Sequence, residues 1–248
     1  MAKKRSIRLY IQEKLQEGAE FIASSDDSHY LCNVMRCVKG DSIKCFNSQD
    51  GEFLCEIINS NKKQTTLLAK NKLRSPVTET DIWLIFAPLK KDKTDIVIEK
   101  SVELGVAKII PVVTEYTNSS QIKIDRFKTQ AKEASEQCER LSVPQISAPT
   151  DLSVILDNWD DSRVLFFMDE RRQGSNIIEQ YTISKDKSCA LLIGPEGGFS
   201  DEEAKLLNSK PFVKNISLGP RILRAETAAV AALSVWQSVV GDWNNKEK

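Results

Sequence analysis

Two turns in the last third of the sequence combine glycine, proline and charged residues in a way that suits ligand binding. The first, Gly-Pro-Glu-Gly-Gly at 194–198, follows the short apolar run 189–193. The second, Gly-Pro-Arg at 219–221, leads into Ile222, Leu223 and Arg224. Neighbouring glycines let a backbone adopt positive φ and approach a ligand closely. We therefore expect one pocket, held mainly by backbone groups, where the two turns meet.

These turns do not match the common phosphate-binding patterns. A dinucleotide fingerprint needs G-x-G-x-x-G and a P-loop needs Gly-Lys-Ser/Thr, and residues 194–198 have neither. The Glu196 carboxylate repels phosphate, but it can accept hydrogen bonds from ribose hydroxyls or pair with a cationic ligand. No metal site is expected, because the single histidine, His29, and six cysteines without a C-x-x-C pair give zinc few ligands.

The elements around the turns indicate an α/β domain. Residues 189–193 are too few for a free-standing helix and are closed by Gly-Pro, so they predict a buried strand. Ser200 with Glu203 has the capping-box spacing that begins a helix, here expected at 201–208. Further strands are expected at 82–87, 108–113, 163–168 and 213–218, and further helices at 93–104, 125–141 and 225–240. This alternation predicts a mostly parallel sheet with helices on both faces and ligands beyond the carboxyl ends of its strands.

The first 73 residues have a different character. Strand-like runs flank Asp50-Gly51, a dipeptide typical of hairpins, and another run covers 65–69. Short strands without long helices suggest a small β-barrel. The polar, proline-containing stretch 74–81 marks a boundary. We expect a β domain at 1–73 and an α/β domain at 74–248.

Composition narrows the class of protein. The chain has 248 residues, 41% of them hydrophobic, which is ample for a packed core. Its 35 Lys and Arg balance 35 Asp and Glu, so any contact with RNA must come from local basic patches. No apolar stretch reaches the length of a membrane span, and the N-terminus lacks the apolar core of a secretory signal. We expect a cytoplasmic protein with reduced thiols and no membrane partner.

The motifs at 193–199 and 218–228 resemble the paired C-terminal motifs of the SPOUT methyltransferases. The best match is the bacterial ribosomal RNA small-subunit methyltransferase E family, the 16S rRNA uracil-N3 methyltransferases. Segments 98–106 and 136–140, and His29 with residues 34–36, agree with it in order along the chain. The resemblance implies a PUA-like barrel that helps to grip RNA, an α/β domain with a deep trefoil knot, a homodimer, and S-adenosylmethionine as cofactor.

The resemblance also implies which residues meet the cofactor, the reacting base and the RNA. The cofactor-binding residues would be Met168, Ile193, Gly194, Glu196, Gly197, Gly198, Leu218, Gly219, Ile222, Leu223, Arg224, Thr227 and Ala228. The catalytic residues would be Arg221, Arg224 and Glu226. The residues that contact RNA phosphates would be Arg8, Arg36, Lys93, Lys100 and Arg140.

The reaction itself suggests roles for the charged residues. Uracil N3 must lose its proton before it attacks a methyl group, which leaves negative charge on O2 and O4. Arg221 and Arg224 are placed to stabilise that charge, and Glu196 or Glu226 is the candidate proton acceptor, with the choice left open. The structural alternatives are a salt bridge between Arg224 and Glu226 or another carboxylate, and ordinary core positions for Ile222 and Leu223.

Two other functions compete with this prediction. A SPOUT enzyme can modify a different nucleotide of ribosomal or transfer RNA, and the N-terminal barrel and the segment 136–140 speak against that alternative. A chain with a damaged pocket can bind RNA without catalysis, and the intact turns speak against this one.

Overall fold

The computed structural model describes residues 7–61, 64–118, 122–171 and 174–244. The chain divides into two compact units, of which the first comprises Met1–Thr78 with Ser135–Val143 and the second Glu79–Ala134 with Pro144–Lys248. The sequence prediction placed a boundary after residue 73 and did not anticipate that a segment from the middle of the chain belongs to the first unit.

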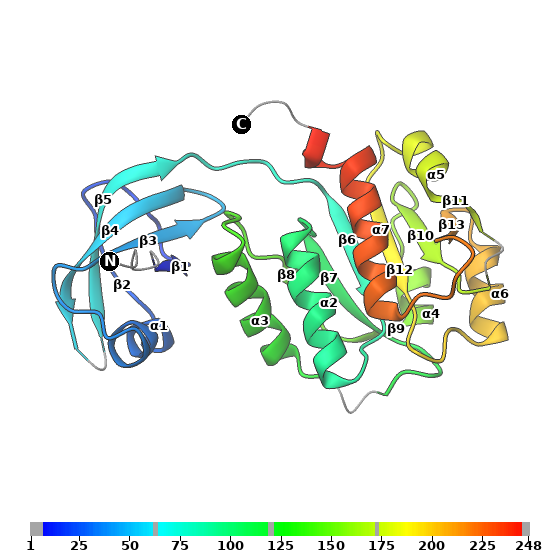
Figure 1. Cartoon of the computed structure of the whole chain (residues 1–248), viewed down its shortest axis with the longest axis horizontal. Helices are drawn as coiled ribbons and strands as arrows, with labels where there is room; N and C mark the ends of the chain where they lie inside the picture. Colours follow the sequence, from blue (N-terminus) through cyan, green and yellow to red (C-terminus); the bar gives the residue numbers. More distant parts are fainter. Residues whose placement is uncertain (1–6, 62–63, 119–121, 172–173, 245–248) are drawn as a thin grey trace. The chain divides into compact units, whose positions relative to one another are not determined.

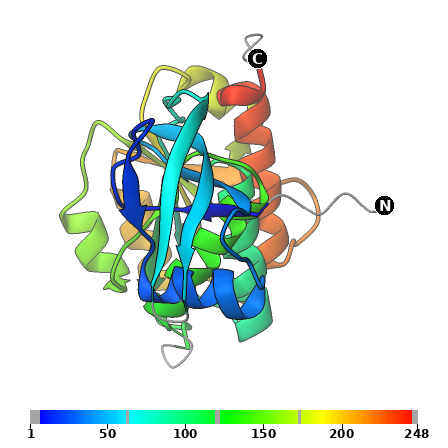
Figure 2. The ribbon, with the colours of Figure 1, turned by 90° about the vertical axis from the view of Figure 1, so that its left-hand side faces the viewer.

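The first unit is built on a five-stranded sheet in the order β1-β3-β4-β5-β2 (Figures 1 and 2). Its strands are β1 (Arg8–Tyr10), β2 (Glu20–Ile22), β3 (Ser42–Asn47), β4 (Gly51–Ser60) and β5 (Thr65–Arg74). Strand β1 runs parallel to β3, and the other pairs are antiparallel. Helices α1 (Ser25–His29) and η1 (Tyr30–Val34) connect β2 to β3.

The predicted hairpin at Asp50-Gly51 is confirmed, because it joins β3 to β4. The Oδ1 atom of Asn47 accepts hydrogen bonds from the backbone N–H groups of Gln49 and Asp50, at 3.0 and 2.6 Å. Gly51 has a φ of 94°, a conformation that favours glycine. The hairpin therefore follows from local chemistry that the sequence displays.

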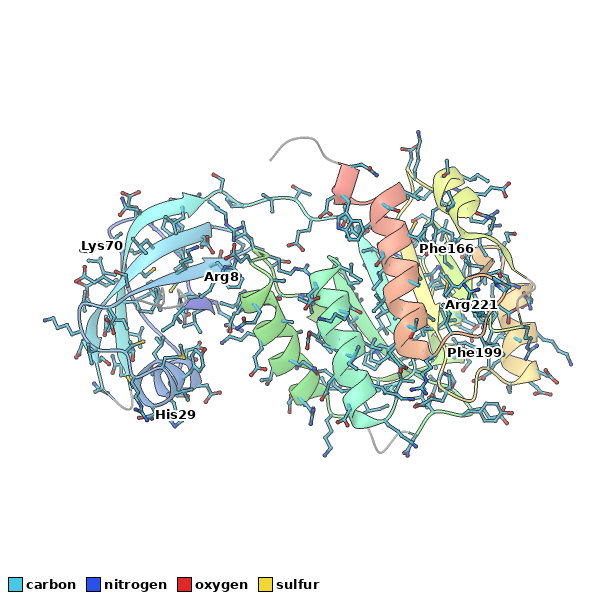
Figure 3. All side chains as sticks on the ribbon, viewed as in Figure 1. Arg8, His29, Lys70, Phe166, Phe199 and Arg221 are labelled. Carbon is cyan, nitrogen blue, oxygen red and sulfur yellow. The ribbon has the colours of Figure 1, made fainter. Side chains whose placement is uncertain are left out.

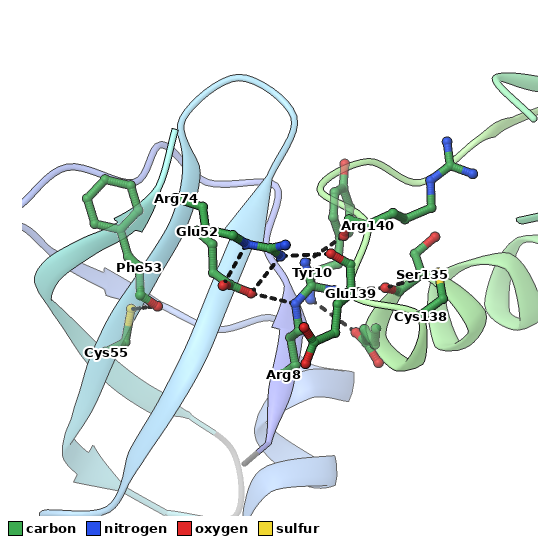
Figure 4. A network of polar contacts seen from close by, with 11 residues as sticks. Arg8, Tyr10, Glu52, Phe53, Cys55, Arg74, Ser135, Cys138, Glu139 and Arg140 are labelled. Atoms are coloured by element: carbon green, nitrogen blue, oxygen red, sulfur yellow. Dashed lines mark hydrogen bonds and ion pairs between the residues drawn. The ribbon is translucent and has the colours of Figure 1, made fainter. Parts of the chain in front are cut away.

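An ion network with a buried centre at Arg8 and Glu52 joins the sheet to the segment Ser135–Val143 within the first unit (Figure 4). The Glu52 carboxylate accepts hydrogen bonds from Arg8 at 2.6 Å and from Arg74 at 3.0 Å. The two guanidinium groups also donate to three backbone carbonyls of that segment at 2.5 to 2.8 Å. Burial alone would raise the pKa of Glu52, but the hydrogen bonds and charges of the two arginines outweigh it and hold the pKa below its usual value.

Helix α3 (Ile124–Gln137) ends four residues earlier than the prediction of a helix to residue 141. Glu139 has a φ of 62°, which turns the chain out of the helix, and Arg74 donates to its carbonyl at 2.7 Å. A non-glycine residue rarely adopts this conformation without support from its surroundings. The end of the helix therefore depends on a residue far away in the sequence.

The second unit contains a sheet in the order β11-β13-β10-β12-β6-β7-β8, with β9 also paired to β7. All its strand pairs are parallel. The longer strands are β6 (Ile82–Phe86), β7 (Lys108–Val113), β10 (Val164–Met168), β12 (Cys189–Ile193) and β13 (Val213–Ser217). The short strands are β8 (Gln145–Ile146), β9 (Thr150–Asp151) and β11 (Ser175–Asn176). The prediction of a parallel sheet is confirmed, although the short strands were missed.

Helices cover both faces of this sheet, as predicted (Figure 1). They are α2 (Lys91–Glu103), α3, α4 (Leu152–Asp157), α5 (Ile177–Ile183), α6 (Asp201–Ser209) and α7 (Ala225–Val239), with a short η3 (Asp242–Asn244) after α7. On one face, Leu156 of α4 and Leu207 of α6 join the core cluster that includes Phe167. On the other, Phe166 packs against Tyr181 of α5, with ring centroids 4.7 Å apart. Phe166 and Phe167 are adjacent in β10, so they point to opposite faces.

In the described part of the chain, no helix is both long and apolar enough to cross a membrane. All six cysteines are free thiols.

Candidate functional site

The turn after β12 is fixed by the cap of α6. Ser200 Oγ accepts a hydrogen bond from the Glu203 backbone N–H at 3.3 Å, and the Glu203 carboxylate accepts one from the Ser200 N–H at 2.9 Å. The predicted capping box is confirmed. Gly198 has a φ of 72° and donates to the Pro195 carbonyl at 3.0 Å. Hydrogen bonds within the protein therefore fix the conformation of this turn at both of its ends.

The turn after β13 leads into α7. Gly219 has a φ of 104°, and no other heavy atom lies within 4 Å of where its Cβ would be. Arg224 is the N-cap residue of α7, and its side chain makes no capping hydrogen bond. The glycine is thus required by backbone conformation, and the arginine side chain is available for another contact.

The two turns bound one cavity of about 560 Å³ at the carboxyl ends of β10, β12 and β13. The predicted site residues that line it are Met168, Ile193, Gly194, Glu196, Gly197, Gly198, Leu218, Gly219, Arg221, Ile222, Leu223, Arg224 and Ala228. Lys93, predicted as a phosphate contact, lines it too. Glu226 and Thr227 belong to the first turn of α7 but do not line the cavity. The sequence prediction that both turns form one pocket is confirmed.

Ile222 and Leu223 are not ordinary core residues. The Ile222 side chain is 73% exposed, and Leu223 is only partly buried. Removing apolar surface from water lowers the free energy, so an exposed apolar pair at the lip of a cavity favours contact with a ligand.

Arg221 and Arg224 are both exposed beside the cavity (Figure 3 labels Arg221). Within the described residues neither guanidinium forms an ion pair, so the predicted alternative of a salt bridge from Arg224 to Glu226 is wrong. The Oε2 atom of Glu226 is buried without a hydrogen-bond partner. A buried unpaired carboxylate oxygen is costly and calls for an explanation, which a bound group would supply.

Two acidic residues that the sequence prediction missed also line the cavity. They are Asp169 and Glu170, which directly follow β10. Glu170 Oε1 accepts a hydrogen bond from the Phe199 N–H at 3.3 Å, and a Cβ on Gly198 would lie 2.3 Å from that oxygen. Their position just after a buried parallel strand is the signal that could have found them, because ligands bind at that edge.

Lys93 and Glu196 face each other across the lip of the cavity. Lys93 Nζ donates to Glu196 Oε1 at 3.2 Å, and both side chains are partly exposed. The carboxylate in the first turn therefore already has a cationic partner on α2.

The prediction that Arg8 contacts an RNA phosphate is wrong. Its side chain is 5% exposed and is held in the Glu52 network, so it cannot reach a phosphate. Lys100 is partly exposed, but hydrogen bonds to Glu103 and Glu99 compensate its charge and raise its pKa. Arg36 is exposed, with a φ of 53°.

Arg140 is the last of the predicted phosphate contacts, and His29 belongs to the segments that carry the family resemblance. Arg140 Nη2 donates to Ser142 Oγ at 2.9 Å. His29 lies exposed in the last turn of α1 (Figure 3). In the described residues there is no group of three or more His, Cys, Asp or Glu side chains arranged to hold a metal ion.

Comparisons with known proteins show that the chain is related to RNA methyltransferases. A family model described as an RNA methyltransferase domain matches residues 76–237, and one described as an RNA methyltransferase PUA domain matches residues 22–68. The ribosomal RNA small subunit methyltransferase E of Rickettsia conorii is 33% identical over 228 residues, which cover 92% of this chain and 93% of that protein.

Two solved structures are similar over nearly the whole chain. A methyltransferase of Legionella pneumophila in complex with bound S-adenosylmethionine has 31% identity and a TM-score of 0.81, covering 94% of this chain and 98% of that one. A ribosomal RNA small subunit methyltransferase E of Neisseria gonorrhoeae, also bound to S-adenosylmethionine, has 25% identity and a TM-score of 0.87, covering 97% and 100%.

Proposed function

This chain belongs to the ribosomal RNA small subunit methyltransferase E family, and from that premise we propose that it transfers a methyl group from S-adenosylmethionine to N3 of a uridine in 16S ribosomal RNA. The observation that carries the proposal is the single cavity formed by both glycine turns at the carboxyl edge of the sheet. The fold of this chain is of the SPOUT type, with a PUA-like N-terminal unit.

The cavity suits this cofactor. S-adenosylmethionine combines a flat adenine, ribose hydroxyls and a positively charged sulfonium. Ile222 and Leu223 offer apolar surface, and the carboxylates of Asp169 and Glu170 suit hydroxyl groups or positive charge. The bound cofactor would supply a methyl group activated by the sulfonium charge.

The reaction requires the protein to orient uracil N3 in line with that methyl group and to stabilise the charge left by its proton. Arg221 and Arg224 line the cavity without ion-pair partners among the described residues, and we assign them to O2 and O4 of the base. Of the two candidate proton acceptors, Glu196 is engaged by Lys93, whereas Glu226 keeps a buried oxygen without a partner. Glu226 does not line the cavity, however, so neither residue is assigned, and Glu196→Gln and Glu226→Gln are tested side by side.

The direct experiment is methyl transfer from labelled S-adenosylmethionine to small ribosomal subunits from a strain that lacks this protein, followed by nucleoside analysis. We expect the label in 3-methyluridine. Label in another nucleoside would show that the protein is an RNA methyltransferase that modifies a different nucleotide. The absence of both transfer to any RNA and binding of the cofactor would favour the alternative of an RNA-binding chain with a damaged pocket.

Three further expectations, two from the family and one from the sequence alone, stay predictions. They are the trefoil knot, the cytoplasmic location and the homodimer. Sedimentation equilibrium across a concentration series tests the dimer, and a monomer at micromolar concentration would contradict it.

A further inference from the structure

An exposed aromatic side chain lies directly behind the first glycine turn. Tyr116 follows β7, and its side chain is 52% exposed. A Cβ built on Gly197 would lie 3.2 Å from Tyr116 Cβ and 3.4 Å from its Cγ and Cδ2. Gly197 lines the cavity and Tyr116 does not, so the turn separates the tyrosine from the cofactor pocket.

The backbone that carries Tyr116 is held in place. The Thr114 N–H donates to Thr117 Oγ1 at 2.9 Å, and the Thr117 N–H donates back to the Thr114 carbonyl at 3.0 Å. The Glu115 N–H donates to Glu203 Oε1 at 2.8 Å, and the other oxygen of that carboxylate caps α6. One glutamate therefore fixes the tyrosine loop and the glycine turn to each other.

Exposure of this kind is unusual in the molecule. In the described part of the chain, only Tyr116 and Trp243 are aromatic residues with largely exposed side chains. A large ring held half in water on a fixed loop offers a flat apolar surface to a partner. Nucleobases stack on such rings, and stacking does not depend on the identity of the base.

We propose that Tyr116 is a stacking platform for an unpaired nucleobase of the RNA that adjoins the nucleotide in the pocket. The inference rests on the proposed function, because it takes RNA as the substrate. Because the stacked base is not the reacting one, Tyr116 contributes to RNA affinity and not to the methyl-transfer step.

The test compares Tyr116→Ala, Tyr116→Trp and the matched control Trp243→Ala, in methyl transfer to small subunits that lack the modification. Tyr116→Ala should raise KM for subunits about tenfold, the loss expected for one stacked base, with little change in kcat. Tyr116→Trp should keep a low KM, and Trp243→Ala should leave KM unchanged. The affinity for S-adenosylmethionine, measured by calorimetry, should be the same in all four proteins.

A cross-link gives a second readout. Subunits assembled with 16S RNA that contains 5-iodouridine are irradiated with the wild-type protein, and tryptic peptides are analysed by mass spectrometry. The peptide 109–123 has Tyr116 as its only aromatic residue, and it should carry the adduct.

The proposal is overturned if Tyr116→Ala keeps the wild-type KM, if it weakens cofactor binding as much as it weakens RNA binding, or if the adduct lies only on other peptides. These failures differ from failure of the proposed function. If the wild-type protein transfers no label to any RNA, the proposed function itself is wrong. If the wild-type protein transfers the label and Tyr116→Ala has an unchanged KM, only the stacking role of Tyr116 is wrong.

Discussion

The two ends of the parallel sheet in the second unit are built in opposite ways. At the amino end, the Arg163 side chain is 7% exposed and donates to Asp81 Oδ2 at 2.5 Å and to the Cys189 carbonyl at 2.9 Å. Its guanidinium also lies 3.7 Å from the centroid of the Trp83 ring. At the carboxyl end, by contrast, the cavity has exposed arginines and an exposed isoleucine. Side chains therefore fill one end and leave the other open.

The charged side chains at the two ends of the sheet also differ in whether they have ion-pair partners within the fold. Burial alone would raise the pKa of Asp81, but hydrogen bonds from Arg163 and Ser188 and the arginine charge outweigh it and lower the pKa. The charged form of Asp81 is thus stabilised by partners within the fold. Arg221 and Arg224 have no such ion-pair partners in the described residues. The contrast concerns ion pairs and not every polar atom, because Arg163 Nε at the amino end is also buried without a hydrogen-bond partner.

The largest effect that would test this comparison is expected for Arg224→Ala. If the guanidinium stabilises charge on the base, methyl transfer should fall by about 100-fold to 1,000-fold in single-turnover assays. Because the side chain is exposed, the free energy of unfolding in urea should change by less than about 0.5 kcal/mol. Arg224→Lys keeps the charge without the forked geometry, so it should recover only part of the rate. A wild-type rate in Arg224→Ala would remove the residue from the mechanism.

The opposite pattern is expected at the amino end. Arg163→Met keeps most of the apolar volume but loses the hydrogen bonds to Asp81 and to the Cys189 carbonyl, so the free energy of unfolding should fall by about 2 kcal/mol. Affinity for S-adenosylmethionine, measured below the unfolding transition, should stay the same.

The matched control for that variant is Arg126→Met. Arg126 also pairs with an aspartate, Asp95, but its side chain is 38% exposed, so less than about 1 kcal/mol should be lost. Equal losses in the two variants would mean that the amino end is not specially stabilised.

Gly198→Ala should show a smaller cost that links stability to binding. The residue has a φ of 72°, and its new Cβ would lie 2.3 Å from Glu170 Oε1, so the free energy of unfolding should fall by about 1 kcal/mol and the pocket carboxylate must move. Gly18→Ala is the control, because Gly18 has a φ of 80° with no heavy atom within 4 Å of its Cβ position. Both variants should lose stability, but only Gly198→Ala should weaken cofactor binding. Equal cofactor binding in both would show that Glu170 is not part of the site.

Local chemistry explains what the sequence predicted correctly. Strand β12 has the predicted bounds because Gly-Pro ends the apolar run, and α6 begins as predicted because Ser200 and Glu203 cap it. Both signals lie within a few residues of the feature that they determine. The meeting of the two turns also followed, since parallel strands bring their carboxyl ends to one edge.

Contacts between distant residues explain what was missed. Arginine commonly binds phosphate, so the residue type of Arg8 suggested an RNA contact. Only the fold shows that Arg8 is buried against Glu52 and a segment more than a hundred residues away. Helix α3 stops early for the same reason, since Arg74 holds the carbonyl of Glu139. Apolar residues are ambiguous too. The sequence pattern around Ile222 fits a core position equally well, and only its 73% exposure distinguishes the two.

Ile222 therefore offers the smallest and most specific test of the comparison. Ile222→Ala removes apolar surface that is already exposed, so the free energy of unfolding should change by less than about 0.5 kcal/mol. If the side chain packs on the adenosine, the cofactor affinity measured by calorimetry should fall by about fivefold, near 1 kcal/mol. Ile178→Ala is the control, because Ile178 on α5 is 56% exposed and does not line the cavity. A loss of stability in Ile222→Ala without a loss of cofactor affinity would show that the Ile222 side chain stabilises the fold and does not contact the cofactor.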